Sequence, residues 1–520
     1  MKANRPLPTR RQILAALALA PASLAAACSN SPAQAQADGS TSDSSPDAGV
    51  PCAPVGQGAQ ITHGPLSGGS TSYSLRLALR LSAPGQVTFS LQPKAGGPPL
   101  LSSCGMAEQV NDFMVICQVT ALQPATVYIA TPLVDGQPVA DRSIETRTFA
   151  PAGVNTAFSF VFGSCCRYYD DGTPSPSLGG TLDAAAALPE RPWFFAQIGD
   201  WTYPDYLFSK TGLDAQGHNF SYYPEKIAAS WRLKFSDKYP IRKLLATMPV
   251  AYVWDDHDFA ENNAHKDVSG LQSDRVGAFA RSMPAWPLPA SKQGVWQKFS
   301  LGQCEFFLTD LRSQRTDIKQ AMLQTVQPDG TKKWQLKEPP GYSLTGSEQM
   351  QWLLDGLTNS TATWKFVFLP VEINPRYDAL LNKSIDMGIV LLIEALGDMW
   401  CGYQSDRAKL LALHTSGKVK NIIFLTGDAH MAAMKGADAD CPAIFMAANL
   451  DISQAPIINM AEQFGFSRTD LWPEWCQDSG DENTIGRVRV VTEPKPQVIF
   501  ESWGASGKLL HSMTVDEVVG

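Results

Sequence analysis

The sequence predicts a mixed α/β (α+β) fold, preceded by a smaller unit built of β-strands alone. Three observations support this fold class. Residues 158–162 and 193–198 are short apolar runs, as expected of strands buried on both faces. Residues 347–357 instead place apolar side chains at helical spacing. Between residues 55 and 150, apolar and polar residues alternate in short segments, as in strands with one buried face.

Length and composition indicate a globular protein. The chain has 520 residues, of which 44% are hydrophobic and 18% are charged, which is enough for a sizeable buried core. Its net charge is −8, and we find no basic run or aromatic–basic patch of the kind that binds nucleic acid. Nucleic-acid binding is therefore not predicted.

Residues 1–28 have the features of an export signal. Arg10 and Arg11 precede an apolar stretch at residues 13–27, and this arrangement resembles a twin-arginine signal, which is recognised by the twin-arginine translocase. An ordinary secretory signal with two arginines is the alternative. The stretch is too short and too interrupted to predict a membrane span. We therefore expect an exported protein, located in the periplasm or at the cell surface.

Two cleavage sites compete after this signal. Residues 24–28 read Leu-Ala-Ala-Ala-Cys and resemble a lipobox, which would place a lipid anchor on Cys28. Residues 35–37 read Ala-Gln-Ala and form a small-residue site of the other type. Residues 29–54 are rich in Ser, Ala, Asp and Pro, which is typical of a flexible tether. Export also favours disulfides, whose pairing is left open, among Cys52, Cys104, Cys117, Cys401, Cys441 and Cys476.

Residues 55–150 are predicted to form a small N-terminal β-sandwich. Strands are expected at residues 75–81, 87–91, 113–119 and 127–131, with turn residues between them. Residues 122–128, Leu-Gln-Pro-Ala-Thr-Val-Tyr, resemble the tyrosine corner of fibronectin type III domains.

Residues 151–520 are predicted to form the larger α/β unit, because strand and helix patterns are mixed along this part of the chain. Beyond the two apolar runs above, the segments expected as strands are residues 250–254, 305–309, 364–369 and 421–425. Helices are expected at residues 347–357 and 405–414.

Residue types that bind metals follow four of these strands. They are Cys165 or Cys166 after the first strand, Asp200 and Tyr203 after the second, Asp255, Asp256, His257 and either Asn262 or Asn263 after the third, and Asp428 and His430 after the fourth. Ligands of open α/β sheets lie beyond the carboxyl ends of the strands, so these side chains are expected to meet. Thiolate and phenolate together suit a strongly Lewis-acidic ion such as ferric iron.

Some of these residues also have simpler interpretations. An Asp after a strand is commonly a turn or helix cap, and this is the favoured interpretation of Asp258; a structural role is likewise favoured for Asn263. Arg312 follows another predicted strand and is expected either to hold phosphate oxygens or to form a structural ion pair.

Taken together, the motifs Gly-Ser-Cys, Gly-Asp-x-x-Tyr, Trp-Asp-Asp-His-Asp and Gly-Asp-x-His resemble those of the PhoD-like alkaline phosphatases, within the calcineurin-like metallophosphoesterases. The resemblance implies a β-sheet sandwich flanked by helices. It implies a cluster of Fe³⁺ and Ca²⁺ rather than Zn²⁺, Mn²⁺ or Mg²⁺. The implied iron ligands are Cys165, Asp200, Tyr203 and His430, and the implied calcium ligands are Asp255 or Asp256, Asn262 and Asp428, with Asp200 bridging.

The resemblance also implies an activity. His257 would assist the reaction, with Asp256 and Arg312 as further catalytic candidates, while an oxygen held by the metals attacks phosphorus. We expect an exported phosphatase acting on phosphomonoesters or phosphodiesters. The alternatives are a phospholipase D-like phosphodiesterase acting on lipid or cell-wall polymer, and a surface binding protein without turnover. Residues 255–263 lack the Tyr-Gly that many relatives carry after Asp-His-Asp, so the substrate preference stays open.

Overall fold

The computed structural model describes residues 58–167, 180–203, 228–268, 275–452, 456–478 and 482–519, except positions 229, 233, 238, 240 and 331. The predicted signal at residues 1–28, the tether at 29–54, Cys28 and Cys52 lie outside the described residues. Within the described ranges, no helix combines the length and the apolar character that crossing a bilayer requires.

A nine-stranded sheet forms one half of the core. Its central strands β9, β10 and β11 run parallel, whereas the C-terminal strands on one side pair antiparallel. In spatial order the strands are β23 (Leu509–Asp516), β22 (Gln497–Gly504), β21 (Thr484–Val491), β9 (Phe158–Gly163), β10 (Phe195–Ile198), β11 (Val250–Val253), β1 (Ile61–Gly68), β2 (Leu75–Leu81) and β5 (Met114–Val119).

A seven-stranded sheet forms the other half. Four of its strands, β13, β16, β17 and β19, run parallel to one another. In spatial order the strands are β12 (Gln297–Leu301), β13 (Cys304–Leu308), β16 (Trp364–Leu369), β17 (Ile422–Thr426), β19 (Ala443–Ala447), β18 (Met431–Lys435) and β20 (Trp475–Asp478).

Phenylalanine side chains fill the space between the two sheets. Phe160 of the first sheet meets Phe306 and Phe366 of the second edge-on, each with 5.5 Å between ring centroids. Phe306 also stacks on Phe366 at 5.1 Å. Successive side chains of a strand point to opposite faces, so neighbours such as Phe307 and Val367 face the other way, toward the helices.

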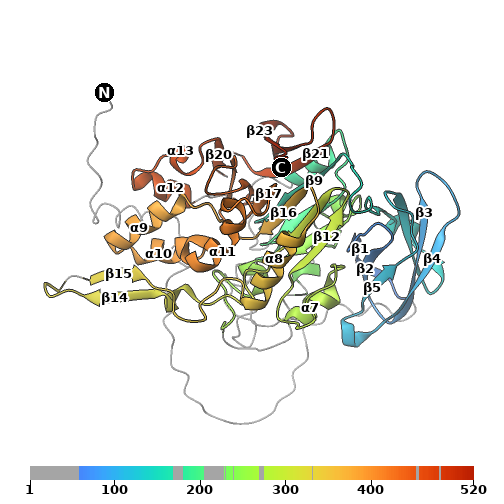
Figure 1. Ribbon diagram of the computed structural model, residues 1–520. Helices are drawn as coiled ribbons and strands as arrows, with labels where there is room; N and C mark the ends of the chain where they lie inside the picture. Colours follow the sequence, from blue (N-terminus) through green and yellow to red (C-terminus); the bar gives the residue numbers. More distant parts are fainter. Residues whose placement is uncertain are drawn as a thin grey trace, which may run out of the picture.

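Helices cover the outer face of the seven-stranded sheet (Figure 1). These helices are α8 (Ser347–Asn359), α9 (Tyr377–Met387), α10 (Val390–Gly397) and α11 (Gln404–Thr415). Shorter helices accompany the nine-stranded sheet, namely α2 (Gly180–Ala186), α5 (Ile241–Leu245), α6 (Asp256–Phe259) and α7 (Arg275–Ser282), and α12 (Pro456–Gln463) and α13 (Arg468–Leu471) lie near β20. The predicted sandwich of sheets flanked by helices is confirmed.

The N-terminal strands form a second, smaller sandwich at one end of the molecule (Figure 1). Strands β1, β2 and β5 pack on a further sheet of β4 (Leu100–Ala107), β3 (Gly85–Pro93), β6 (Val127–Val134), β7 (Gln137–Pro138) and β8 (Ile144–Arg147). Cys104 and Cys117 form a disulfide between β4 and β5. The Tyr128 hydroxyl accepts a hydrogen bond from the Gln123 backbone N–H at 2.8 Å, as a tyrosine corner requires.

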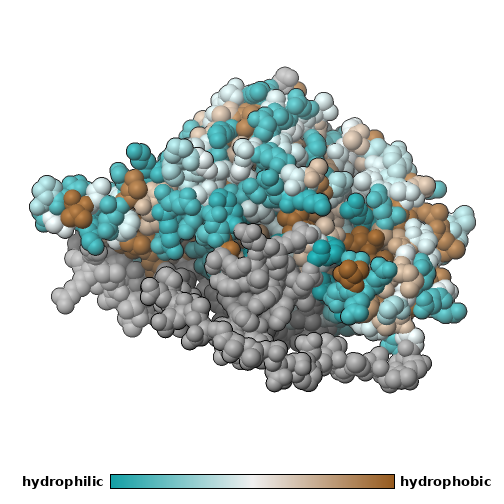
Figure 2. Space-filling model, turned by 90° about the horizontal axis from the view of Figure 1, so that it is seen from below, coloured by the Kyte–Doolittle hydropathy of each residue, from teal (hydrophilic) through white to brown (hydrophobic). Residues whose placement is uncertain are grey.

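The smaller sandwich does not stand apart from the core. Strand β1 pairs in parallel with β11, with Gly68 opposite Val250, so one sheet runs through both units. At the opposite end of the molecule, the two-stranded hairpin of β14 (Met322–Val326) and β15 (Lys332–Leu336) projects outward (Figure 1). On the face seen in Figure 2, hydrophilic residues predominate over the described part of the surface.

The strand and helix predictions are confirmed with small shifts at their ends. Residues 75–81 and 364–369 coincide with β2 and β16, and the predicted helices match α8 and α11 within two residues. Three cysteines with predicted disulfides, Cys401, Cys441 and Cys476, form no disulfide with another cysteine among the described residues.

Phe306→Ala is expected to lower the free energy of unfolding by about 3–5 kcal/mol, because it removes a ring packed between both sheets and leaves a cavity. Urea unfolding followed by tryptophan fluorescence measures the change. Leu101→Ala is the control: its side chain is 65% exposed, so the change should stay within about 0.5 kcal/mol. Equal effects of the two substitutions would contradict this packing.

Glu372→Gln is expected to alter how stability depends on pH. Burial raises the pKa of Glu372 to about 7, although its carboxylate accepts hydrogen bonds from the Asn374 N–H and the Thr426 hydroxyl. The folded state therefore holds this proton more tightly than the unfolded state. Stability from the protonated side chain is present below about pH 4.5 and is lost as the pH rises through about 7.

Glutamine has no charge to gain, so the free energy of unfolding of the variant should not fall in this way as the pH rises. Relative to the wild type, the variant should therefore gain about 3 kcal/mol in free energy of unfolding between pH 4.5 and 7. Urea unfolding of both proteins at pH 4.5, 6 and 8 measures the difference. A difference that does not change with pH would show that Glu372 is ionised throughout.

Candidate metal centre

The carboxyl ends of β9, β10, β11 and β17 meet at one place, and the loops after them carry the predicted ligands. Backbone hydrogen bonds hold the first two loops together: Cys165 N–H donates to Gly199 O at 3.3 Å, and Cys166 N–H donates to Asp200 O at 2.9 Å. At Gly199, with φ +104°, an added Cβ would lie 2.4 Å from the Cβ of Asp255. Only glycine lets the second loop approach the third this closely.

Four of the predicted ligands have left-handed backbone conformations. The φ angles are +59° at Cys165, +53° at Asp200, +66° at Asp428 and +53° at His430. Such conformations are uncommon outside glycine and cluster at functional sites, where the surrounding structure holds them in place.

The first group of ligand atoms belongs to Cys165, Asp200 and His430, whose candidate ligand atoms lie within 4.8 Å of one another. The Cys165 Sγ is 3.6 Å from Asp200 Oδ2, and the Tyr203 hydroxyl donates to the same oxygen at 2.9 Å. Cys165, Asp200 and Tyr203 are buried, and His430 is partly exposed. The thiol, phenol, carboxylate and imidazole predicted for one metal are therefore neighbours.

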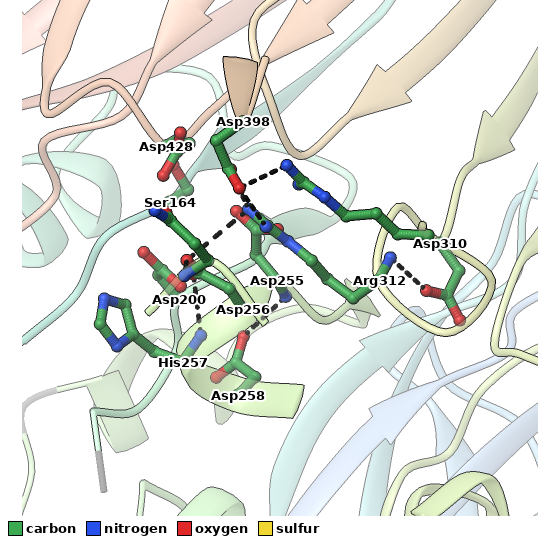
Figure 3. Close-up of polar contacts among 12 residues, drawn as sticks. Ser164, Asp200, Asp255, Asp256, His257, Asp258, Asp310, Arg312, Asp398 and Asp428 are labelled. Carbon is green, nitrogen blue, oxygen red and sulfur yellow. Dashed lines mark hydrogen bonds and ion pairs between the residues drawn. The ribbon is translucent and has the colours of Figure 1, made fainter. Parts of the chain in front are cut away.

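The second group contains oxygen ligands only. Carboxylate oxygens of Asp200, Asp255, Asp256 and Asp428 lie within the same 4.8 Å of one another (Figure 3). Asp200 belongs to both groups, which is the arrangement expected of a bridging carboxylate. A third group joins Asp200 and Asp256 to His257 on α6. The His257 ring lies 4.3 Å from the Tyr203 ring, measured between centroids.

The raised pKa values of these acidic groups indicate a site that favours bound cations. Burial raises the pKa of Asp200 well above its usual range, and the carboxylate of Asp256 adds to this. Burial likewise raises the pKa of Asp428, with Asp255 as the next cause, and that of the Cys165 thiol, with Asp200 as the next cause. Burial raises the pKa of Asp255 to about 7, against the lowering effect of Arg312. A bound cation would offset the repulsion and favour the ionised forms.

The residues present fit bound metal ions. Asp200 Oδ1 and Asp255 Oδ2 are buried, and neither has a hydrogen-bond partner among the described residues. Buried carboxylate oxygens normally have partners, so two without any, side by side in ligand groups, indicate places for cations. The donor set of the first group suits a Lewis-acidic ion such as ferric iron, and that of the second suits a hard cation.

Of the alternatives left open by the sequence, Cys165 belongs to a ligand group. Cys166 instead packs into the core between the sheets. Asp255 and Asp256 both belong to ligand groups, so both remain candidates. Asn262 is exposed in the turn after α6, and the N–H of Asn263 donates to Asp256 Oδ2 at 2.6 Å.

The structure places Arg312 beneath the carboxylates, fully buried. Its guanidinium contacts Asp255 and lies 3.0 Å from Asp398 and 3.7 Å from Asp256 (Figure 3). Of the two interpretations offered by the sequence, this is the structural ion pair. Asp398 has no counterpart in the sequence predictions, because it follows helix α10 rather than a strand.

Asp258 ties two ligand loops together. Its carboxylate accepts hydrogen bonds from the backbone N–H groups of Trp201 at 3.1 Å, Thr202 at 2.9 Å and Asp255 at 3.2 Å. This is the structural role that the sequence favoured for Asp258. It fixes the loop carrying Asp200 against the start of α6.

Asp258→Ala is expected to destabilise the protein by about 3 kcal/mol or more, because it leaves three buried N–H groups without an acceptor. Asp258→Asn keeps an amide oxygen and should cost less. Urea unfolding of both variants gives the comparison. A change below about 1 kcal/mol for the alanine variant would mean that water replaces the carboxylate.

Two packed sheets with helices outside them, and Asp, His and Cys side chains gathered at their strand ends, form a metallophosphoesterase-like fold. The sequence profile of the PhoD-like phosphatases matches residues 160–455, more than half of the chain, and includes the four ligand loops. The chain therefore belongs to the PhoD-like phosphatase family.

Individual relatives agree with this assignment. Alkaline phosphatase D of Bacillus subtilis (strain 168) is 23% identical over 303 residues, which are 55% of this chain and 48% of that protein. The chain thus spans about half the length of this curated relative.

Solved structures share the fold. The structure of PhoD aligns with a TM-score of 0.62 at 19% identity, covering 88% of this chain and 94% of that chain. Purple acid phosphatase PPD1 from yellow lupin (Lupinus luteus) seeds aligns with a TM-score of 0.55 at 12% identity, covering 87% and 74%.

Proposed function

We propose that this protein is a metal-dependent phosphoric ester hydrolase acting on phosphomonoesters or phosphodiesters. The observation that carries the proposal is Asp200, a buried carboxylate shared by two adjacent ligand groups of different chemistry. Membership in the PhoD-like phosphatase family supports the same conclusion.

Cys165, Asp200, Tyr203 and His430 would hold Fe³⁺, because thiolate and phenolate suit this ion. Asp200, Asp255, Asp256 and Asp428 would hold Ca²⁺, with Asn262 as a further candidate, because all are oxygen donors. When bound, such ions polarise the phosphoryl oxygens and neutralise their charge.

The chain's own residues would prepare the reaction. His257 lies beside Asp200 and Asp256, and an imidazole can gain or lose a proton near neutral pH. It could therefore donate a proton to the leaving oxygen of the ester. Contact with the Tyr203 ring orients the imidazole. Asp256 accepts a hydrogen bond from the His257 backbone N–H at 2.8 Å, which fixes the first turn of α6.

We also infer that the protein acts outside the cytoplasm. The support comes from the sequence of residues 1–28, with Arg10 and Arg11 before an apolar stretch, and from the lipobox-like segment ending at Cys28. Export by the twin-arginine translocase would deliver a folded protein that already carries its metals.

Asp200→Asn is expected to reduce bound metal and to lower kcat/KM by at least about 100-fold, because loss of even an outer partner of a ligand commonly costs 10–100-fold. Elemental analysis and visible absorption of the exported protein measure the metals, and Tyr203→Phe should shift any iron–phenolate band. Hydrolysis is measured on p-nitrophenyl phosphate, bis-p-nitrophenyl phosphate and phosphatidylcholine.

Asp355→Asn is the matched control, since it removes the same charge from an exposed position on α8. It should change neither metal content nor rate. If metal-loaded wild-type protein hydrolyses none of the three esters, the proposed activity is wrong. Binding of a phosphoester without turnover would instead favour the binding-protein alternative.

A further inference from the structure

A chain of buried charges runs from the metal centre toward the helical layer. It begins at Asp255, passes through Arg312 to Asp398, and continues through Arg315 to the Tyr403 hydroxyl. All five residues are buried. Figure 3 shows Arg312 between Asp255 and Asp398, with its side chain directed at both.

Each nitrogen of the Arg312 guanidinium lies close to a carboxylate oxygen. Its Nε donates to Asp255 Oδ1, its NH1 group donates to Asp398 Oδ1 at 3.2 Å, and its NH2 group lies 3.0 Å from Asp398 Oδ2. Since its side chain has no exposed surface and all three nitrogens face acids, it is placed as an internal counter-ion. This placement does not leave the guanidinium free to bind a phosphate fork-to-fork.

The contact with Arg312 gives the two oxygens of the Asp255 carboxylate different surroundings. Oδ1 is held by Arg312, whereas Oδ2 has no hydrogen-bond partner among the described residues and belongs to a side chain of the oxygen-only group. An arginine on one oxygen orients the other, just as outer partners orient metal ligands in general.

Asp398 lies between two arginines and separates their charges. Arg315 binds Asp398 Oδ1, the oxygen that also accepts from Arg312, and its Nε donates to the Tyr403 hydroxyl at 3.0 Å. That hydroxyl donates to Thr316 O at 2.5 Å, and the Tyr403 ring stacks on Tyr342 at 4.7 Å. Without Asp398, two neighbouring guanidinium groups would repel each other and Arg312 would lose its outer anchor.

The chain of buried charges also joins separate parts of the fold. Asp255 follows β11 of the nine-stranded sheet, and Arg312 and Arg315 follow β13 of the seven-stranded sheet. Asp398 follows α10, and Tyr403 precedes α11. The position of one metal-centre carboxylate is thereby set by both sheets and by the helices outside them.

We propose that Asp398 is a positioning residue for the metal centre: it anchors Arg312 so that Asp255 presents its free oxygen to the cation of the oxygen-only group. The proposal rests on the proposed function, because it assigns a role toward the same cations. It predicts a selective effect, in which the oxygen-only group weakens while the group of Cys165, Asp200, Tyr203 and His430 keeps its metal.

The test uses the full-length protein after treatment with EGTA. Equilibrium dialysis measures binding of Ca²⁺, or of Mn²⁺ or Zn²⁺ if the wild type prefers one of them, and elemental analysis measures the retained iron. Asp398→Asn should weaken binding of the added cation by about 10–100-fold with iron content unchanged. Tyr403→Phe is a milder change at the far end of the chain of buried charges. It should also weaken binding of the added cation, but by a smaller factor.

Asp378→Asn is the matched control, because Asp378 also pairs with a buried arginine, Arg407, but in the helical layer between α9 and α11. It should leave both metals unchanged. Wild-type cation affinity in folded Asp398→Asn, or parallel loss of both metals, would overturn the positioning role. If Asp398→Asn does not fold, unchanged affinity in Tyr403→Phe would overturn it. A wild type that binds no cation would refute the proposed function itself.

Discussion

Four neighbouring carboxylates are the constraint on which this structure depends. Asp200, Asp255, Asp256 and Asp428 bring oxygens within 4.8 Å of one another, the first three side chains are buried, and Arg312 lies against Asp255 and Asp256. Burying like charges is unfavourable unless positive charge is supplied. The centre is therefore built for cations, and its empty form would carry repulsion that the surrounding fold has to contain.

The fold withstands this repulsion because the loops that carry the carboxylates are held rigidly. Three of the ligand loops leave the neighbouring parallel strands β9, β10 and β11, and the fourth leaves β17 of the other sheet. Hydrogen bonds between the strands and aromatic packing between the sheets hold these strands in place. Asp258 fastens one loop to the next, and Arg312 reaches across from the second sheet. Left-handed backbone conformations at Cys165 and Asp428 are tolerated because both neighbours and partners hold them.

Sequence reasoning reached the strands and most residues of the candidate ligand groups because both have local signals. An apolar run such as residues 364–369 marks a buried strand, and polar residues directly after such runs converge at one sheet edge. Strands β21 to β23 lie outside the predicted elements, as does the pairing of β1 with β11. The alternation of apolar and polar residues indicates which face of a strand is buried, but it does not indicate which strand lies beside it in the sheet. Asp398 gave no signal because its contact with Arg312 forms only when the end of α10 meets the loop after β13.

The shared nine-stranded sheet limits how freely this protein can be divided. In many proteins a small β-sandwich is a module that can be exchanged without disturbing its neighbour. Here β1 covers the edge of β11, the strand that leads directly into Asp255. A chain starting at residue 151 would expose the N–H and C=O groups of that edge. The N-terminal sandwich thus shares a sheet with the larger unit, despite its modular appearance in sequence.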